Sequence, residues 1–350
     1  MEKAILILTS TRYDKSSWSG TNYSLDSFLS KYFTIVYEKY ELQNLGIFYR
    51  FFKKINLIFA KVVLKHNINY TPIWYLRIQT KKFLKRIKEK DCKLIITTVC
   101  NLIPFISKDY FVIYITDAVY KSMIGYYWFN IPKNIIDYHN NIQNLAIQRS
   151  NIISVSSEWA KNECLKYYPN NNIISVNYYG PNCSKIKPSK THKNNNEIHL
   201  LFCGVDKIRK GLNKAIEIVE TVNKIDNLST YILDVIGISG SNTDLVKYHG
   251  KLYKDNESDF NIFNELFNNA FILILPTVAE CSAIVFSEAA MYKIPVMTNN
   301  TGGTSSYVKN NINGFLFNVN DSSSITLLLY KAAILLISST VPKSFMVTLW

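Results

Sequence analysis

Two glutamates, Glu280 and Glu288, lie eight positions apart in the segment FILILPTVAECSAIVFSEAAMYKIPVMTNNTGG, residues 271–303. The segment predicts a short apolar strand, a loop, a helix that begins near Ser282, a second strand and a diglycine turn. The first backbone N–H groups of a helix have no partner inside the helix, so its start can hold an anion. Carboxylates before and within that helix can accept hydrogen bonds from hydroxyl groups. A phosphate held between hydroxyl-binding carboxylates indicates a nucleotide sugar.

The elements that must position these residues alternate between strand and helix along the chain. Apolar, β-branched runs such as FVIYITD (111–117) are typical of strands buried in a parallel sheet. Residues 212–225, LNKAIEIVETVNKI, predict an amphipathic helix. The Lys- and Asn-rich segment 184–196 predicts a linker between an N-terminal domain, 1–183, and a C-terminal domain, 197–350. This order predicts an α/β protein with two doubly wound, Rossmann-like domains that face a central cleft.

Length and composition describe a globular protein. A chain of 350 residues with 48% hydrophobic residues is long enough for two domains and too apolar to be disordered. The six cysteines form no C-x-x-C pair and have no histidine at metal-ligand spacing, so we expect free thiols in a reducing compartment. The apolar run at the N-terminus is too short for a signal peptide, and LLLYKAAILLI near the C-terminus is too short to span a bilayer. We therefore expect a cytoplasmic protein.

The segment around the two glutamates resembles a known family. PTVAECSAIVFSEA followed by IPVMTNNTGGTSSYV is similar to the E-x7-E region of the family 4 (GT4) retaining glycosyltransferases, which have the GT-B fold. The matching residues occur in the family's order and are Pro276, Glu280, Glu288, Ala289, Pro295, Gly302, Gly303 and Asn313-Gly314-Phe315. The resemblance implies that Glu280 contacts the donor sugar and that Glu288 contacts the ribose of the nucleotide.

The resemblance also implies roles for residues that follow other predicted strands. In FCGVDKIRKGLNKAIEI, Arg209 and Lys210 would stabilise the charge on a leaving nucleoside diphosphate without a metal ion. Asp117, in YITDAVYKSMIGYY, would interact with the reacting sugar or with the acceptor hydroxyl. The alternatives are a solvated basic turn for the first pair and a helix N-cap for Asp117. The other donor-binding residues that the resemblance implies are Gly20, Gly250, Lys251, Leu252, Cys281, Ser282, Ala283 and Ile284.

The chain departs from the family's pattern at Ala283, where family members often have glycine, and at two further places. Lys293 stands where the family has glycine at the end of the Glu-bearing helix, and a left-handed conformation there would cost about 1 kcal/mol. The family ends with a long helix that returns to the first domain, whereas residues 332–350 lack that amphipathic pattern. We therefore expect a shortened or altered C-terminal helix, which bears on domain closure.

The net charge of +14 is concentrated in residues 50–90, which hold twelve basic residues and a single acidic one. Aromatic residues are interleaved with the basic ones at helical spacing, which predicts a surface that lies on an anionic membrane. Nucleic acid is the rival partner, but we find no recognition motif and expect no nucleic-acid binding. Amphipathic helices with solvated lysines are the remaining alternative. The membrane hypothesis predicts a peripheral position on the inner face of the cell membrane.

The sequence thus predicts a retaining glycosyltransferase of the hexosyltransferase class that needs neither metal nor cofactor. Its donor would be a UDP- or GDP-linked sugar, and its acceptor a cell-surface glycan or a lipid-linked glycan. One alternative is a non-catalytic relative that binds nucleotide sugars. The other is a nucleotide-sugar epimerase of the same fold, which would need acid–base residues that we do not find.

Overall fold

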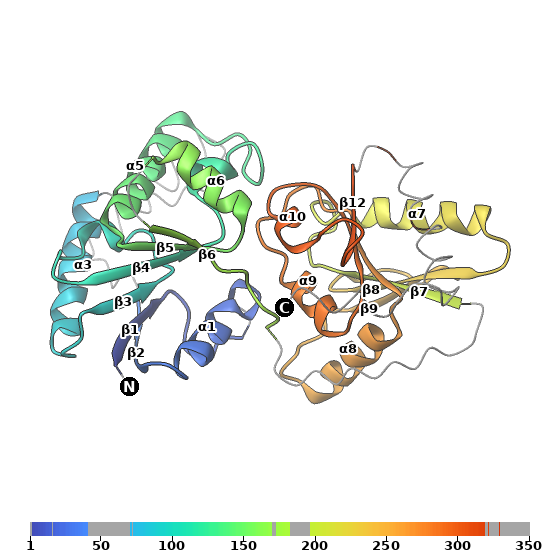
Figure 1. The fold of residues 1–350 in the computed structure, drawn as a ribbon, viewed down its shortest axis with the longest axis horizontal. Coiled ribbons are helices and arrows are strands. Elements are labelled where there is room, and N and C mark those ends of the chain that lie inside the picture. Colours follow the sequence, from blue (N-terminus) through green and yellow to red (C-terminus); the bar gives the residue numbers. More distant parts are fainter. Residues whose placement is uncertain are drawn as a thin grey trace. The chain divides into compact units, whose positions relative to one another are not determined.

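The chain divides into two compact units, Met1–Asn177 and Tyr178–Trp350. The computed structural model describes residues 2–15, 17–40, 71, 73–169, 173–182, 197–318, 321 and 329 (Figure 1). The predicted linker, 184–196, lies outside these residues, as do residues 50–70 of the basic segment and the C-terminal segment 332–350. The division between the units comes slightly before the predicted domain end at residue 183.

The N-terminal unit contains a parallel six-stranded sheet with the order β2-β1-β3-β4-β5-β6. Its strands are β1 (Lys3–Leu8), β2 (Thr34–Lys39), β3 (Leu94–Thr97), β4 (Phe111–Thr116), β5 (Ile152–Val155) and β6 (Ile173–Val176). Its helices are η1 (Ser17–Gly20), α1 (Thr21–Leu29), α3 (Ile73–Lys88), η2 (Ile103–Phe105), α4 (Tyr120–Met123), α5 (Lys133–Arg149) and α6 (Glu158–Tyr167).

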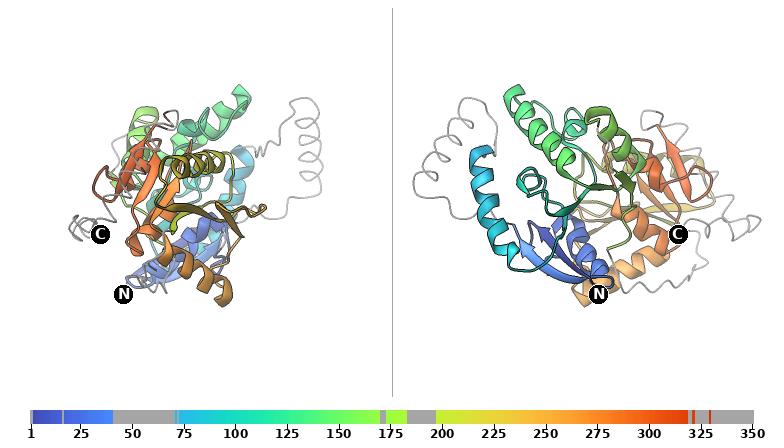
Figure 2. Two further views of the ribbon diagram at one scale, coloured as in Figure 1. Left: turned by 90° about the vertical axis from the view of Figure 1, so that its right-hand side faces the viewer. Right: turned by 60° about the vertical axis from the view of Figure 1, so that its left-hand side comes forward.

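Strand β1 lies inside this sheet and is buried along almost its whole length. Ile5 and Ile7 belong to a core that also contains side chains of α3, α5 and α6, among them Phe83, Ile147 and Cys164. Figure 2 shows α3 as a peripheral helix of the unit. Because parallel sheets need apolar cover on both faces, the near-continuous apolar sequence of β1 suits this central position.

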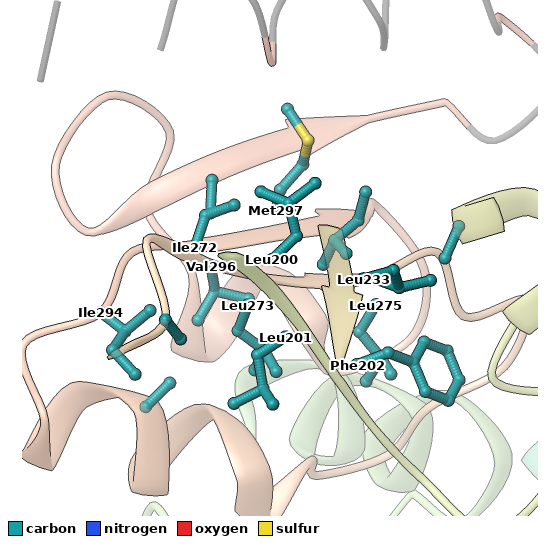
Figure 3. Packing of buried hydrophobic residues seen from close by; sticks show 14 of the residues in the cluster. Leu200, Leu201, Phe202, Leu233, Ile272, Leu273, Leu275, Ile294, Val296 and Met297 are labelled. Carbon is teal, nitrogen blue, oxygen red and sulfur yellow. The ribbon is translucent and has the colours of Figure 1, made fainter. Parts of the chain in front are cut away.

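The C-terminal unit contains a second parallel sheet of six strands, with the order β12-β11-β10-β7-β8-β9. Its strands are β7 (Glu197–Cys203), β8 (Thr230–Ile236), β9 (Val246–Gly250), β10 (Ile272–Leu275), β11 (Val296–Asn299) and β12 (Gly314–Phe317). Its helices are α7 (Leu212–Ile225), α8 (Glu257–Asn269), α9 (Ile284–Met291) and α10 (Thr304–Tyr307). Figure 3 shows part of its core, in which Leu200, Leu273 and Met297 from neighbouring strands are fully buried.

The strand order of the C-terminal sheet reverses next to β7. The chain runs from β7 outward to β9, then returns to the other side of β7 and continues from β10 to β12. Leu201 pairs with Leu273, and each strand ends two residues later, at Cys203 and Leu275. The connections that follow β7 and β10 therefore leave the sheet side by side, at the kind of edge where open α/β sheets bind ligands.

The residues directly after Asn177 are fastened to the C-terminal unit. The Ser287 hydroxyl donates to the Tyr179 carbonyl at 2.6 Å, and the Tyr179 N–H donates to the Tyr307 hydroxyl at 3.0 Å. The rings of Tyr178 and Tyr307 meet edge to face, with centroids 5.5 Å apart. These contacts explain why the second unit begins at Tyr178.

Several sequence predictions can be compared with these elements. The helix predicted at 212–225 is α7, which confirms its bounds. The helix predicted to begin near Ser282 begins at Ile284, and Ala283 is its N-cap residue. Lys293 has a φ of 59° and does adopt the left-handed conformation. None of the helices among the described residues combines the length and the apolar character needed to cross a bilayer.

Candidate functional site

The connection between β7 and α7 is a tight basic turn. The Arg209 N–H donates to the Asp206 carboxylate at 3.0 Å, and the Lys210 N–H donates to the Asp206 carbonyl at 3.0 Å. Gly211 ends the turn as the N-cap of α7 with a φ of 77°. A Cβ atom at Gly211 would lie 2.1 Å from the carbonyl oxygen of Pro276, so only glycine allows this turn to meet the connection after β10.

The two neighbouring connections are joined by hydrogen bonds. The Arg209 carbonyl accepts from the Val278 N–H at 2.8 Å and from the Thr277 hydroxyl at 3.0 Å. The Arg209 guanidinium donates to the Ala279 carbonyl at 3.1 Å. These contacts within the protein hold the arginine in place. Binding sites for charged groups require this kind of preorganisation.

Glu280 is a buried carboxylate paired with two cations. It is 6% exposed, its Oε2 lies 3.4 Å from Arg209 Nη1, and the same oxygen accepts from Lys210 Nζ. Its backbone carbonyl accepts from the Gly303 N–H at 2.8 Å, which ties it to the diglycine turn. A buried carboxylate is costly unless it is paired, so the two cations offset the cost of burying Glu280 in this position. The structure therefore brings Arg209, Lys210 and Glu280 together.

Glu288 lies in α9 and is 2% exposed. Its Oε1 accepts from Lys254 Nζ, and Lys254 belongs to the connection between β9 and α8. Lys254 was not among the predicted site residues. It lies two residues after Leu252, a predicted donor-binding residue, but nothing in the sequence indicates that it pairs with a residue 34 positions away.

Cys203 lies within the electrostatic influence of both ion pairs. It is the last residue of β7, and Glu288, Lys254 and Lys210 all act on its thiol electrostatically. Burial, with a smaller contribution from the Glu288 charge, raises the pKa of Cys203 to about 12. The thiol is therefore neutral at physiological pH, and charges of both ion pairs act on the end of β7.

The remaining predicted donor-binding residues of this unit occupy two places. Gly250 ends β9 with a φ of 66°, Lys251 is exposed with its ammonium 4.6 Å from the centroid of the Tyr253 ring, and Leu252 packs against the core. The other residues, which connect Glu280 to α9, are Cys281 and Ala283, both buried, and Ser282 and Ile284, both half-buried. Within the described residues, no three His, Cys, Asp or Glu side chains are grouped to hold a metal ion.

The predicted residues of the N-terminal unit, Asp117 and Gly20, lie in connections that follow strands of its sheet. Asp117 directly follows β4, is half-buried, and accepts a hydrogen bond at 3.2 Å from the indole N–H of Trp18. Gly20 is the N-cap of α1 and has a φ of 85°. Trp18 and Ser19, which precede it, have φ values of 50° and 54°. Left-handed conformations cost about 1 to 2 kcal/mol for each non-glycine residue, so this turn is strained. Trp18 was not among the predicted residues.

A carboxylate bridged by two histidines lies on the strands next to Gly250. Asp234 accepts from His199 Nδ1 and from His249 Nε2, each at 2.7 Å. The hydrogen bond to Asp234 raises the pKa of His199, although burial opposes it. Burial alone would raise the pKa of Asp234, but the bonds from His199 and His249 outweigh it and lower that pKa. Attraction between the Asp234 carboxylate and the two histidines therefore stabilises the folded C-terminal unit.

We expect the contribution of this cluster to stability to depend on pH. The raised pKa of His199 gives stability that is complete below its ordinary value of 6.5 and is lost as the pH rises through the folded value. The lowered pKa of Asp234 gives stability that is present above 3.8 and is lost on further acidification. The melting-temperature difference between the wild type and His199→Gln should thus be largest between these two values and shrink toward pH 8.5. A melting-temperature difference that stays the same from that interval up to pH 8.5 would contradict the raised pKa of His199.

Residues 184–332 match the family model of the group 1 glycosyl transferases. The chain carries a glycosyltransferase domain. That domain contains every strand of the C-terminal sheet, both ion pairs and the diglycine turn. The chain is accordingly an enzyme of the glycosyltransferase class.

Solved structures of glycosyltransferases align with nearly the whole chain. A glycosyltransferase from Rickettsia africae ESF-5 aligns with a TM-score of 0.64 and 16% identity over 96% of this chain and 89% of that one. The apo form of WaaB, a lipopolysaccharide outer core galactosyltransferase, aligns with a TM-score of 0.63 and 13% identity, over 94% and 90%. HepE of Anabaena, solved with UDP and glucose, aligns with a TM-score of 0.59 and 13% identity, over 95% and 90%. These likenesses confirm the predicted GT-B fold class. A comparison with curated proteins found no match.

The pairing of Glu288 leads to a binding prediction for this glycosyltransferase. Glu288→Ala should weaken the binding of the cognate nucleoside diphosphate about 10- to 100-fold, because a hydrogen bond to a charged group is worth roughly 1.5 to 3 kcal/mol. Isothermal titration with UDP and GDP measures the loss. Glu217→Ala, which breaks an exposed ion pair with Lys214 on α7, is the control and should bind normally. Wild-type affinity in a folded Glu288→Ala protein would contradict a contact with the nucleotide.

Proposed function

We propose that the chain is a retaining GT4-type glycosyltransferase that moves a hexose from a nucleoside-diphosphate sugar to a glycan or lipid-linked acceptor. The observation that carries this proposal is the buried Glu280 carboxylate, held by Arg209 and Lys210 where β7 and β10 end side by side. This position is the switch point of the C-terminal sheet, where doubly wound sheets bind nucleotides.

Each charged group has a distinct task in the proposed reaction. Arg209 and Lys210 stabilise the negative charge that develops on the departing diphosphate, a task for which fixed cations suffice. Glu280 accepts hydrogen bonds from the donor sugar, Glu288 accepts from the ribose, and Gly250, Lys251 and Leu252 border the base. The family resemblance implies attack on the same face that the leaving group departs from, with the departing phosphate assisting removal of the acceptor proton.

The ion pairs explain how a ligand would compete for these cations. Glu280 is an anion that Arg209 and Lys210 share, and Arg209 Nε also lies 3.5 Å from Asp206 Oδ2. A diphosphate carries more charge than a carboxylate and binds Arg and Lys through strong charge-assisted hydrogen bonds. Donor binding would therefore draw the two cations toward the phosphates and leave Glu280 to bind sugar hydroxyls.

Thermal-shift screening against UDP-, GDP- and ADP-sugars tests the donor class. We expect stabilisation by sugars of one nucleoside diphosphate, followed by its release when an acceptor is added. Proton NMR of the product should show the anomeric configuration of the donor, and turnover should persist with EDTA. Stabilisation without sugar release would instead indicate a non-catalytic binding protein. An isomerised donor in the absence of acceptor would indicate an epimerase.

The outer face of α3 supports the proposed membrane contact. Trp74 is 60% exposed and Ile78 is 44% exposed, at the N-terminal end of this helix. The exposed basic residues that continue the same face are Arg77, Lys81, Lys82, Lys85 and Arg86. The opposite face, with Leu76 and Phe83, is buried in the core. We propose that the basic face holds the enzyme on the inner, anionic surface of the cell membrane, as a peripheral protein.

Liposome flotation tests this contact. Wild-type protein should float with vesicles that contain phosphatidylglycerol and should stay behind with pure phosphatidylcholine. The variant Lys81→Glu/Lys82→Glu/Lys85→Glu should lose most of its flotation. The matched control, Lys31→Glu/Lys108→Glu/Lys133→Glu, changes the net charge equally at exposed lysines of the same unit outside α3. Equal loss in both variants would point to overall charge rather than to this helix face.

A further inference from the structure

The turn between β1 and α1 has an unusual backbone for residues that are not glycine. Trp18, Ser19 and Gly20 occupy three consecutive left-handed conformations, with φ values of 50°, 54° and 85°. Such a conformation persists only where surrounding contacts hold it, and strained residues cluster at functional sites. The contacts around Trp18 therefore indicate the purpose of the turn.

Side-chain hydrogen bonds anchor the turn on its N-terminal side. The Ser17 N–H donates to the Asp14 carboxylate at 3.1 Å. The buried Asn22 side chain donates to the Ser17 hydroxyl at 3.1 Å and to the Ser10 hydroxyl at 3.0 Å. Asn22 thus ties the turn to the residues that leave β1. These bonds hold the backbone from which the Trp18 side chain projects.

The left-handed turn brings the Trp18 indole to Asp117, 99 residues away in sequence. Trp18 Nε1 donates to Asp117 Oδ2 at 3.2 Å, so the connections after β1 and β4 meet through this bond. An indole N–H donates and cannot accept, and it does not release its proton at physiological pH. Trp18 can therefore orient the carboxylate without competing with it in proton transfer.

We propose that Trp18 is a positioning residue that holds the Asp117 carboxylate for the hydroxyl group of a saccharide acceptor, and that the strained turn serves this contact. The inference rests on the proposed glycosyltransferase function. It adds a residue from the β1–α1 connection to the acceptor side of the reaction. The acceptor is a polyol, for which an oriented carboxylate is a suitable partner because it accepts from hydroxyl donors in a fixed direction.

The contact itself can be tested without turnover. The chain has five tryptophans, so a ¹H–¹⁵N spectrum contains five indole N–H signals, and Trp18→Phe identifies the one from Trp18. Asp117→Ala should shift that signal upfield as the hydrogen bond is lost, and should leave the other four close to their positions. An unmoved Trp18 signal in folded Asp117→Ala would overturn the proposal.

Kinetics with the donor found in the thermal-shift screen test the role. Trp18→Phe keeps an aromatic ring but removes the N–H, so we expect kcat to fall about 10-fold while the KM for the donor stays unchanged. Asp117→Ala should lower kcat further than Trp18→Phe does. The double variant Trp18→Phe/Asp117→Ala should have the same kcat as Asp117→Ala alone, because Trp18 acts through Asp117. Trp159→Phe removes an indole N–H elsewhere in the unit and serves as the control.

The outcomes separate the two levels of the proposal. Additive losses in the double variant, or a higher donor KM in Trp18→Phe, would overturn the positioning role while leaving the glycosyltransferase function intact. A wild-type protein that binds donors without transferring sugar would overturn the function, and with it the role of Trp18, even if the indole signal reports the bond to Asp117.

Discussion

The double variant Arg209→Ala/Lys210→Ala is expected to lose at least about 1,000-fold in turnover. Removing one preorganised donor that faces developing charge typically costs 100- to 1,000-fold, and this variant removes two cations from one site. The loss should lie in kcat, because the charge on a leaving diphosphate grows as the bond to the sugar breaks. Release of nucleoside diphosphate from the cognate donor, measured at saturation, gives the effect.

Control variants must distinguish a loss of catalysis in Arg209→Ala/Lys210→Ala from a loss of folding. Arg209 and Lys210 also neutralise Glu280, and a buried carboxylate without its partners destabilises a protein by several kcal/mol. The variant Arg209→Met/Lys210→Met/Glu280→Gln removes all three charges together and should regain most of the melting temperature without regaining activity. Lys207→Ala, an exposed lysine of the same turn, should keep normal turnover. Near-normal rates in a folded double variant would contradict the role in charge stabilisation.

Gly211→Ala is expected to destabilise the C-terminal unit by more than about 3 kcal/mol. Alanine at this position would have to adopt the left-handed conformation of Gly211, which costs about 1 kcal/mol. Its Cβ would also lie 2.1 Å from the Pro276 carbonyl oxygen. A backbone atom cannot move aside as a flexible side chain does, so the β7 and β10 connections must separate. Activity should fall with stability, because that separation displaces Arg209 from Thr277 and Val278.

Gly250→Ala is the matched control for this effect. Gly250 has a φ of 66° in the same unit, but a Cβ there would meet only the Ser239 hydroxyl, at an ordinary 3.8 Å. The control should therefore show the conformational cost alone, about 1 kcal/mol. Urea unfolding of both variants measures the difference. Equal losses at the two glycines would show that the close approach to Pro276 contributes nothing.

The sequence predicts the features that depend on neighbouring residues. Alternating apolar and amphipathic segments indicate the strands and α7, and the ordered motif from Pro276 to Gly303 indicates where Glu280 lies. Helix α9 begins at Ile284 and not near Ser282 as predicted. No Ser, Thr, Asp or Asn side chain caps it, and helix ends without a capping side chain are hard to locate from sequence. Helix α8 was not predicted, although Asn256 caps it and accepts from the Asp259 N–H, a recognisable start signal.

Contacts between distant segments could not be predicted from the sequence. Lys254 meets Glu288 across 34 residues, and Trp18 meets Asp117 across 99. Neither pair has a periodicity or spacing that a local pattern can reveal, because the strand order brings each pair together. The left-handed turn at Trp18 and Ser19 is equally hidden, since tryptophan and serine give no sign of a positive φ. Residues that hold a catalytic group in place therefore become visible only once the fold is known.

The contacts of Tyr178 and Tyr179 limit where the polypeptide can be cut for expression of the C-terminal unit alone. A fragment designed from the linker would begin near residue 197 and would lose the carbonyl that Ser287 donates to. It would also remove the Tyr178 ring that meets the Tyr307 ring edge to face. Ser287 precedes Glu288 in α9, so such a truncation would loosen the helix that carries the ribose-contacting carboxylate in our proposal. A fragment that starts at Asn177 would keep that support and is the better choice for soaking experiments.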